Sequence, residues 1–250
     1  MKIKPLPYIA AIASVALVLT LTGFLDRAER ERFQEKKAIE IIDRLTAIRA
    51  KLEAAINQRL SVAEGLAAYA STRPNLTQAE FTELARVLVA QKSGIRTVAF
   101  SKGTILSYYY PLEGNESAIG TNLMELPEQR ELVKKVISTR KTLVAGPVNL
   151  IQGGVAFISR TPVFLTPPNE LPSSGDFIGL VFVMITKERL LEDAGLLEPS
   201  RELKYALRGK NSLGVAGEVF FGDVDIFEKQ PVTLSVTLPN GSWQLAAIPK

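Results

Sequence analysis

Two groups of residues in the middle of the chain have the chemistry of a binding site. Tyr108, Tyr109 and Tyr110 follow one another on a predicted strand, where alternation sends Tyr108 and Tyr110 to one face and Tyr109 to the other. Tyr108 and Tyr110 are therefore candidates to line a ligand pocket, with packing in the core or across strands as the alternative. Arg160 lies in an otherwise apolar strand. It could bind an anionic ligand through two parallel hydrogen bonds, or pair with a carboxylate, or face solvent.

The composition excludes several kinds of chemistry. The 250 residues include no His and no Cys, which rules out Ser/His/Asp and Cys/His catalysis, the usual zinc sites and disulfides. We expect no catalytic residue, no cofactor and no metal in this segment, so that it is not itself an enzyme. The net charge of +4 comes from 30 basic and 26 acidic residues spread along the chain. Without a basic stripe, we expect no nucleic-acid partner.

The N-terminus has the pattern of a membrane anchor. Residues 5–25 carry no charge, and a helix of that length spans the roughly 30 Å hydrocarbon core of a bilayer. Lys2 and Lys4 precede the run and predict a cytoplasmic N-terminus. We therefore expect residues 1–25 to form a cytoplasmic N-terminus and transmembrane anchor in the inner (cell) membrane, with residues 26–250 periplasmic or extracellular. A cleaved signal peptide is the alternative, but the run is long for one and lacks a clear A-x-A site.

Residues 26–74 are predicted to form a stalk helix that continues from the anchor. The first part is densely charged, and helix-breaking sequence appears only around Pro74. Apolar residues then recur at steps of three and four, at Ile41, Leu45, Ile48, Leu52, Ile56, Leu60, Ala63, Ala67 and Ala70. We expect the lower half of this seam to pair with a second copy, giving a homodimer, and the upper half to pack on the following domain.

The rest of the chain predicts an α+β fold built on antiparallel sheets. Helices are expected over 77–91, 127–139 and 187–194, where apolar residues show helical spacing. Strands are expected over 95–100, 104–110, 142–145, 155–165, 177–186, 203–207, 217–221, 232–238 and 243–248. The nearly continuous apolar run 177–186 predicts the buried central strand.

Several stretches taken together resemble a known family. The segments SYYYPLEGNESAIGTNL, LVAGPVNLIQGGVAFISRTPVF, GLVFVMI, GEVFFGD and GSWQLAAIP resemble the CHASE domain, the extracellular sensory module of receptor-like histidine kinases and nucleotide cyclases. The resemblance implies a membrane-distal PAS-like sensory domain, here 75–195, and a smaller membrane-proximal PAS-like domain, here 196–250. It also implies a second transmembrane helix and a cytoplasmic kinase or cyclase domain beyond the tail.

The resemblance also implies ligand contacts. In the plant cytokinin receptors, an Asp after the loop anchors the ligand, the backbone of the next strand adds hydrogen bonds, and a Gly leaves room. The matching positions here are Asn122, Val144 and Gly179. Asn in place of Asp is a departure. Because an amide both donates and accepts hydrogen bonds, the ligand need not be a purine.

Three functions remain in competition. The first is a periplasmic or extracellular sensor that binds an unknown small molecule and transmits the signal through the stalk helix. The second is a single-span scaffold protein of a pilus or secretion assembly, without a small-molecule site. The third is an anchored enzyme, which the missing catalytic residue types disfavour.

Overall fold

A computed structural model describes residues 6–90, 94–149, 154–200 and 202–250, and within 6–35 it describes only the side chains of Phe24 and Glu29. The chain divides into two compact units, Met1–Arg44 and Leu45–Lys250. The first unit is the beginning of helix α1 (Leu6–Ser71), where Glu40 and Arg44 form an ion pair one turn apart at 2.8 Å.

The backbone of the expected membrane anchor over 5–25 belongs to α1 from residue 6 on, but of its side chains only Phe24 is described. Within the part of the chain that is described, no helix is both long and apolar enough to cross a membrane. The anchor therefore stays a prediction from sequence.

The second unit contains two antiparallel sheets. The N-terminal sheet has the order β2-β1-β5-β4-β3, with bounds β1 Ile95–Lys102, β2 Ile105–Tyr110, β3 Leu143–Asn149, β4 Val155–Phe164 and β5 Phe177–Thr186. Strand β5 is central, as its continuous apolar run predicts, and five of its ten residues in a row, Gly179 to Val183, are buried. The C-terminal sheet has the order β7-β6-β9-β8, with bounds β6 Leu203–Arg208, β7 Val219–Phe221, β8 Val232–Leu238 and β9 Gly241–Pro249.

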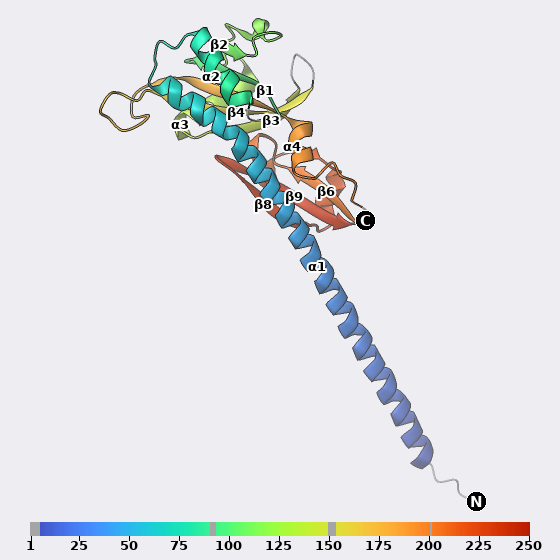
Figure 1. Cartoon of the computed structure of the whole chain (residues 1–250). Helices are drawn as coiled ribbons and strands as arrows, with labels where there is room; N and C mark the ends of the chain where they lie inside the picture. The colour runs from blue at the N-terminus through green and yellow to red at the C-terminus, as the bar shows by residue number, and fades with distance from the viewer. Residues whose placement is uncertain (1–5, 91–93, 150–153, 201) are drawn as a thin grey trace, which may run out of the picture. The chain divides into compact units, whose positions relative to one another are not determined.

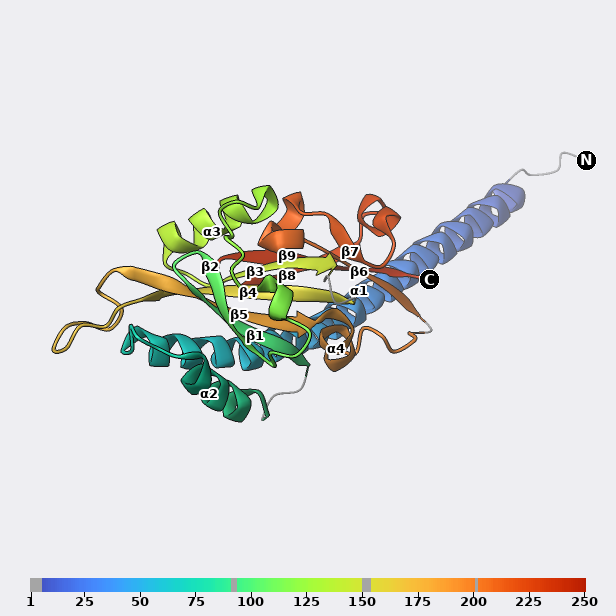
Figure 2. The ribbon, with the colours of Figure 1, turned by 90° about the horizontal axis from the view of Figure 1, so that it is seen from above.

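Helices cover both faces of the N-terminal sheet (Figures 1 and 2). Helix α3 (Pro127–Thr139) lies on one face, while α2 (Gln78–Ala90) and the part of α1 beyond residue 45 lie on the other. Because side chains alternate along a strand, different residues of the sheet contact the helices on its two faces. Leu180 and Phe182 of β5 join the cluster that contains Val133 and Val136 of α3, whereas Phe100 of β1 packs against Phe81 of α2 with ring centroids 6.4 Å apart.

Local sequence sets the ends of these helices. Helix α1 ends at Ser71, before the expected break at Pro74. Helix α2 begins with a capping box, in which the Glu80 amide donates to the Thr77 hydroxyl (3.3 Å) and the Thr77 amide donates to the Glu80 carboxylate (2.9 Å). Hydrogen bonds from Thr77 lower the pKa of Glu80 below its usual value. Helix α3 starts on Pro127 and ends at Thr139, and the next residue, Arg140, caps it with a left-handed backbone (φ 54°).

The upper half of the α1 seam is buried inside the second unit, as expected. Leu45, Leu52, Ile56, Leu60 and Ala63 are each at most 4% exposed. An apolar seam of this kind contributes about 1.5–3 kcal/mol per fully buried Leu or Ile. One charged residue is buried with them: Arg59 donates to the carboxylate of Asp193 at 2.5 Å, at the end of α4 (Lys187–Asp193).

The two sheets of the second unit make direct contact. The Ser212 hydroxyl donates to the Val144 carbonyl (2.5 Å), and the Gly146 amide donates to the Asn211 side-chain oxygen (2.8 Å). Val144 and Gly146 belong to β3, and Asn211 and Ser212 belong to the short 3-10 helix η2 (Lys210–Ser212). The Phe157 ring on β4 also packs against Trp243 on β9, with centroids 4.7 Å apart. Polar and aromatic contacts therefore tie the C-terminal sheet to β3 and β4.

Candidate ligand site

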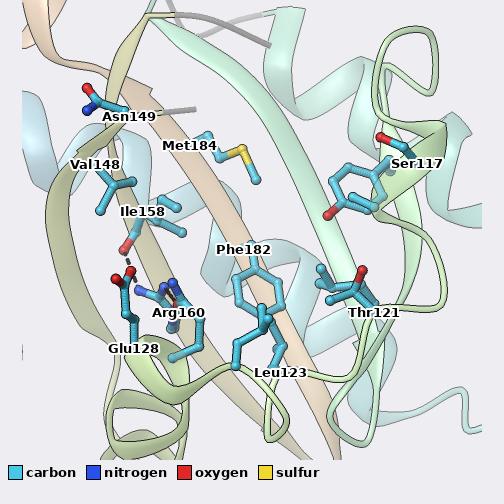
Figure 3. Close-up of a pocket in the computed structure, with 15 residues that line it drawn as sticks. Ser117, Thr121, Leu123, Glu128, Val148, Asn149, Ile158, Arg160, Phe182 and Met184 are labelled. Carbon is cyan, nitrogen blue, oxygen red and sulfur yellow. Dashed lines mark hydrogen bonds between the residues drawn. The ribbon is translucent and has the colours of Figure 1, made fainter. Parts of the chain in front are cut away.

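A cavity of about 280 Å³ opens between α3 and the N-terminal sheet. Its roof is α3 and the loop between β2 and α3, which carries the 3-10 helix η1 (Glu116–Ala118). The apolar side chains of the lining come from four strands and the loop and include Leu106, Leu123, Val148, Ile158, Phe182 and Met184. The polar ones include Glu128, Gln129, Asn149 and Arg160. Figure 3 shows Asn149 apart from Glu128 and Arg160. An apolar wall with few polar groups is typical of small-molecule sites.

Two strand irregularities shape this wall. In β2, Tyr108 pairs with Phe100 but Leu106 pairs with Ser101, so Ser107 is an extra residue. Leu106 and Tyr109 are three residues apart, so in a regular strand their side chains would point to opposite faces. Because of the bulge, both line the cavity. In β3, a second irregularity lies between Ala145 and Val148 and brings Val148 to the wall.

Gly146 makes the second irregularity possible. Its φ is 104°, and a Cβ there would lie 2.9 Å from the Ala156 carbonyl oxygen. Only glycine combines that backbone conformation with so close a neighbour.

Arg160 is a buried cation in the middle of the sheet. It is 2% exposed and lies between Leu143 of β3 and Phe182 of β5. Its guanidinium donates to the Gln129 side-chain oxygen and, at 3.5 Å, to the Ile158 carbonyl, while its Nε has no partner in the described part of the chain. Among the described residues no carboxylate forms an ion pair with it. Burial lowers the pKa of Arg160 to about 10, so the group stays cationic at neutral pH.

A second cavity, of about 540 Å³, adjoins the first. Both are lined by Glu128, Gln129, Val148, Asn149 and Arg160, and the second is also lined by Lys210 and Asn211 of η2. Arg160 therefore lies where the cavity of the N-terminal sheet meets the elements that lead to the C-terminal sheet.

The structure separates the three tyrosines as alternation predicts, but the one on the cavity is Tyr109. Burial raises the pKa of Tyr109 to about 12. Tyr108 lies on the α2 face, where its hydroxyl donates to the Leu76 carbonyl (2.6 Å) and its ring stacks on Phe100. Neither Tyr108 nor Tyr110 lines the cavity. For these two residues the core-packing interpretation fits the geometry, because the cavity is on the other face of β2.

Asn122 lies in the loop that roofs the cavity, but its side chain holds the loop. The side-chain oxygen accepts from the Thr104 hydroxyl (3.0 Å) and the Met124 amide (3.1 Å), and the side-chain amide donates to Glu125 (3.0 Å). Its neighbours Thr121 and Leu123 line the cavity instead. The resemblance thus leads to a loop that lines the cavity, and within it to a residue that fixes the loop's turn.

Val144 and Gly179 also have structural partners. The Val144 carbonyl, the expected backbone contact, accepts the Ser212 hydroxyl described above. A Cβ at Gly179 would lie 1.9 Å from the Ser101 carbonyl oxygen. The glycine therefore leaves room for strand β1, and neither residue lines the cavity.

Of the six expected ligand contacts, the cavity includes Arg160. Gln129, Phe182 and Met184 were missed. Gln129 lies among other polar residues of an amphipathic helix, and the two β5 residues lie within a continuous apolar run, so no sequence pattern distinguishes them. Across the described residues, no group of three or more acidic side chains could hold a metal ion.

The fold resembles solved ligand-binding domains of receptors. The extracellular ligand binding receptor from Desulfohalobium retbaense DSM5692 has a TM-score of 0.59 and 16% identity, over 82% of this chain and 39% of that one. The ligand-binding domain of the amino acid chemoreceptor PctC of Pseudomonas aeruginosa PAO1, in complex with GABA, has a TM-score of 0.57 and 14% identity, over 80% and 95%.

The ligand-binding domain of PctB from Pseudomonas aeruginosa PAO1, in complex with L-Gln, has a TM-score of 0.59 and 11% identity, over 83% of this chain and 89% of that one. At these identities the likeness concerns the fold. No curated protein sequence matches the chain significantly. The family model of the CHASE domain matches residues 22–214, which covers α1 from residue 22, the whole N-terminal sheet and its cavity. The chain therefore belongs to the CHASE domain family.

Proposed function

We propose that this chain is the periplasmic or extracellular sensory domain of a membrane signalling receptor, and that it binds a small molecule in the cavity beside Arg160. The observation that carries the proposal is the cavity itself, which combines an apolar wall with a buried cation that has no counter-ion among the described residues. CHASE family membership and the likeness to receptor ligand-binding domains support it. A scaffold protein would have no need of such a site.

The membrane arrangement is part of the same proposal. The uncharged run 5–25 would anchor the chain, with Lys2 and Lys4 holding its N-terminus in the cytoplasm. A histidine kinase or nucleotide cyclase domain inside the cell would then receive the signal. The stalk helix would pair with a second copy, giving a homodimer.

Signal transmission would use the contacts that join the cavity to α1 and to the C-terminal sheet. A ligand can shift an equilibrium only through different contacts in two states. The candidates are β3, which contacts η2 through Val144 and Gly146, and α4, which contacts α1 through Asp193 and Arg59. A ligand that moves β3 would therefore affect η2 and the C-terminal sheet, and one that moves β4 or β5 would affect the stalk helix through α4, which packs on both strands.

The test is a thermal-unfolding screen of the full chain in detergent against small metabolites, comparing wild type with Ser117→Trp. Ser117 is exposed at the rim of the cavity, so a Trp there should obstruct ligand entry without unfolding the chain. The control is Ser138→Trp, at an exposed position of α3 away from the cavity.

We expect at least one compound to raise the Tm of wild type and of Ser138→Trp by mass action, and to lose this effect with Ser117→Trp. A screen in which no compound stabilises the chain, or in which Ser117→Trp responds like wild type, would contradict the proposal.

A further inference from the structure

The electrostatics of the cavity indicate the chemical class of its ligand. A cation with 2% exposure has lost most of its hydration, and a buried charge normally has an opposite charge beside it. The described partners of Arg160 are the Gln129 side-chain oxygen and the Ile158 carbonyl, and no described carboxylate forms an ion pair with it. The missing partner would be an anion from outside the chain.

The geometry of the guanidinium specifies the shape of that anion. An arginine has five N–H donors arranged as a planar fork. With the described residues Arg160 makes two hydrogen bonds, one of them a weak contact of 3.5 Å to the Ile158 carbonyl, and its Nε has no partner among them. A carboxylate, with two oxygens in one plane, fits such a fork through two parallel bonds.

The surrounding charges favour a single negative charge on the ligand. Lys210 lines the second cavity but forms an ion pair with Glu218 at 2.8 Å. Glu128 lines both cavities and would repel an anion. Among the described residues that line the two cavities, Arg160 is therefore the cation left to compensate a ligand, and a doubly charged phosphate would remain partly uncompensated in a site of low dielectric.

The apolar wall specifies the rest of the molecule. Phe182 is the direct cross-strand neighbour of Arg160, and Met184 is the neighbour of Ile158. These side chains, with Leu106, offer a hydrocarbon surface within reach of the guanidinium. The volume of about 280 Å³ is at the lower limit of the roughly 300–1,000 Å³ typical of drug-sized sites, so the ligand is small.

We propose that the ligand is a small organic monocarboxylate, with its carboxylate on Arg160 and its hydrocarbon group against Phe182 and Met184. This inference rests on the proposed sensory function and narrows it to one ligand class. Glu128 is the acidic side chain at the cavity, and it would hold an ammonium group if the ligand were an α-amino acid. A simple carboxylic acid and an amino acid both carry the carboxylate that would bind Arg160.

The test compares matched compounds on the full chain in detergent by thermal unfolding and titration calorimetry. The series is 4-methylpentanoate, its amide, its alcohol and leucine, with inorganic phosphate as a second anion. The variant is Arg160→Met, which keeps the volume of the side chain and removes the charge. Because an apolar replacement of an unpaired buried charge tends to be neutral or stabilising, this variant should fold. The control is Arg86→Met, at an exposed position of α2.

We expect the carboxylate or leucine to bind to wild type and to Arg86→Met, and the amide, the alcohol and phosphate to bind at least about 10-fold more weakly. Arg160→Met should weaken carboxylate binding by about 10- to 100-fold, as expected for losing charge-assisted hydrogen bonds. If leucine binds and 4-methylpentanoate does not, and if Glu128→Gln abolishes the binding of leucine, the ligand is an α-amino acid, which is one form of the proposal.

Equal binding of the alcohol and the acid, equal binding of phosphate, or unchanged acid binding to Arg160→Met would each overturn the carboxylate assignment. Neutral compounds that bind wild type but not Ser117→Trp would still support a sensory site. The two proposals can therefore fail separately.

Discussion

Burial changes the ionisation expected of an arginine. The pKa of Arg160 falls to about 10 because water no longer stabilises its charge. The group remains cationic below pH 10 and releases its proton above it. A bound carboxylate favours the charged form and would raise this pKa.

The first prediction, at the scale of this residue, concerns the pH dependence of carboxylate binding. Affinity should be constant between about pH 6 and 9, because the ligand is ionised above its pKa of roughly 4–5 and Arg160 is still protonated. It should fall above pH 10, as Arg160 loses its proton. The chain has no His, the side chain that ordinarily titrates between pH 5 and 8.

Titration calorimetry at pH 6, 8 and 10.5 checks this, with far-UV circular dichroism to show that the chain is folded at each pH. A tenfold change in affinity between pH 6 and 8 would indicate that a group other than Arg160 controls binding.

The other candidate residues show that one sequence pattern can have either a functional or a structural explanation. A glycine beside a ligand and a glycine beside a crossing strand look alike in sequence. At Gly179 a Cβ would lie 1.9 Å from the Ser101 carbonyl oxygen. The close approach of β1 therefore explains why a larger residue would not fit.

At the scale of elements, α1 is attached to the domain by an apolar seam and one buried ion pair. Arg59 is 1% exposed, and its guanidinium also donates to the Ala55 carbonyl (2.8 Å). Asp193, in contrast, is partly exposed, with 24% of its side chain accessible, and it also pairs with Arg189 at 3.0 Å. Breaking the ion pair should therefore cost different amounts of stability, depending on whether Arg59 or Asp193 is replaced.

The second prediction follows from this asymmetry. Asp193→Ala should lower the free energy of unfolding by about 3 kcal/mol, because it leaves the buried Arg59 cation with the Ala55 carbonyl but without its counter-ion. Arg59→Met should cost about 1 kcal/mol or less, because Asp193 keeps Arg189 and partial hydration. Urea denaturation of the two variants measures both values. The reverse order would mean that packing of the Arg59 side chain, and not its charge, dominates the contact.

At the scale of the whole second unit, the link between the two sheets contains the single tryptophan of the chain. Trp243 is 1% exposed and packs against Phe157 and Phe220, with ring centroids 4.7 and 5.1 Å away. Its indole N–H has no partner among the described residues. Phe157 is on β4 next to Ile158, which lines the cavity.

The third prediction uses this tryptophan as a reporter. Ligand binding should change the intensity or wavelength of Trp243 emission, because a shift of β3 or β4 alters the packing around the indole. Phe157→Leu should reduce the change while ligand affinity stays within about threefold of wild type, since residue 157 points away from the cavity. Fluorescence titration of both proteins provides the measurement. Saturating ligand without any change in emission would show that the C-terminal sheet does not respond.

Much of the fold could be predicted because the signals are local. The break at Pro74, the helix 127–139 and the strand 177–186 all lie where periodicity and turn residues indicate. The bulge inside β2, whose bounds agree with the predicted strand 104–110, and the extent of β3 past Gly146 were not predicted. Both strands contain a bulge, and a bulge depends on the partner strand.

The sequence by itself determined the class of fold, the exclusion of His and Cys chemistry, and the presence of an arginine in an apolar strand. Only the tertiary structure decided that Tyr109 faces the cavity, that Asn122 holds a turn, and that no described carboxylate pairs with Arg160. The physical reason is that helices and strands follow from neighbours in sequence, whereas strand register and the charges that face a buried group are set by residues far apart in the chain.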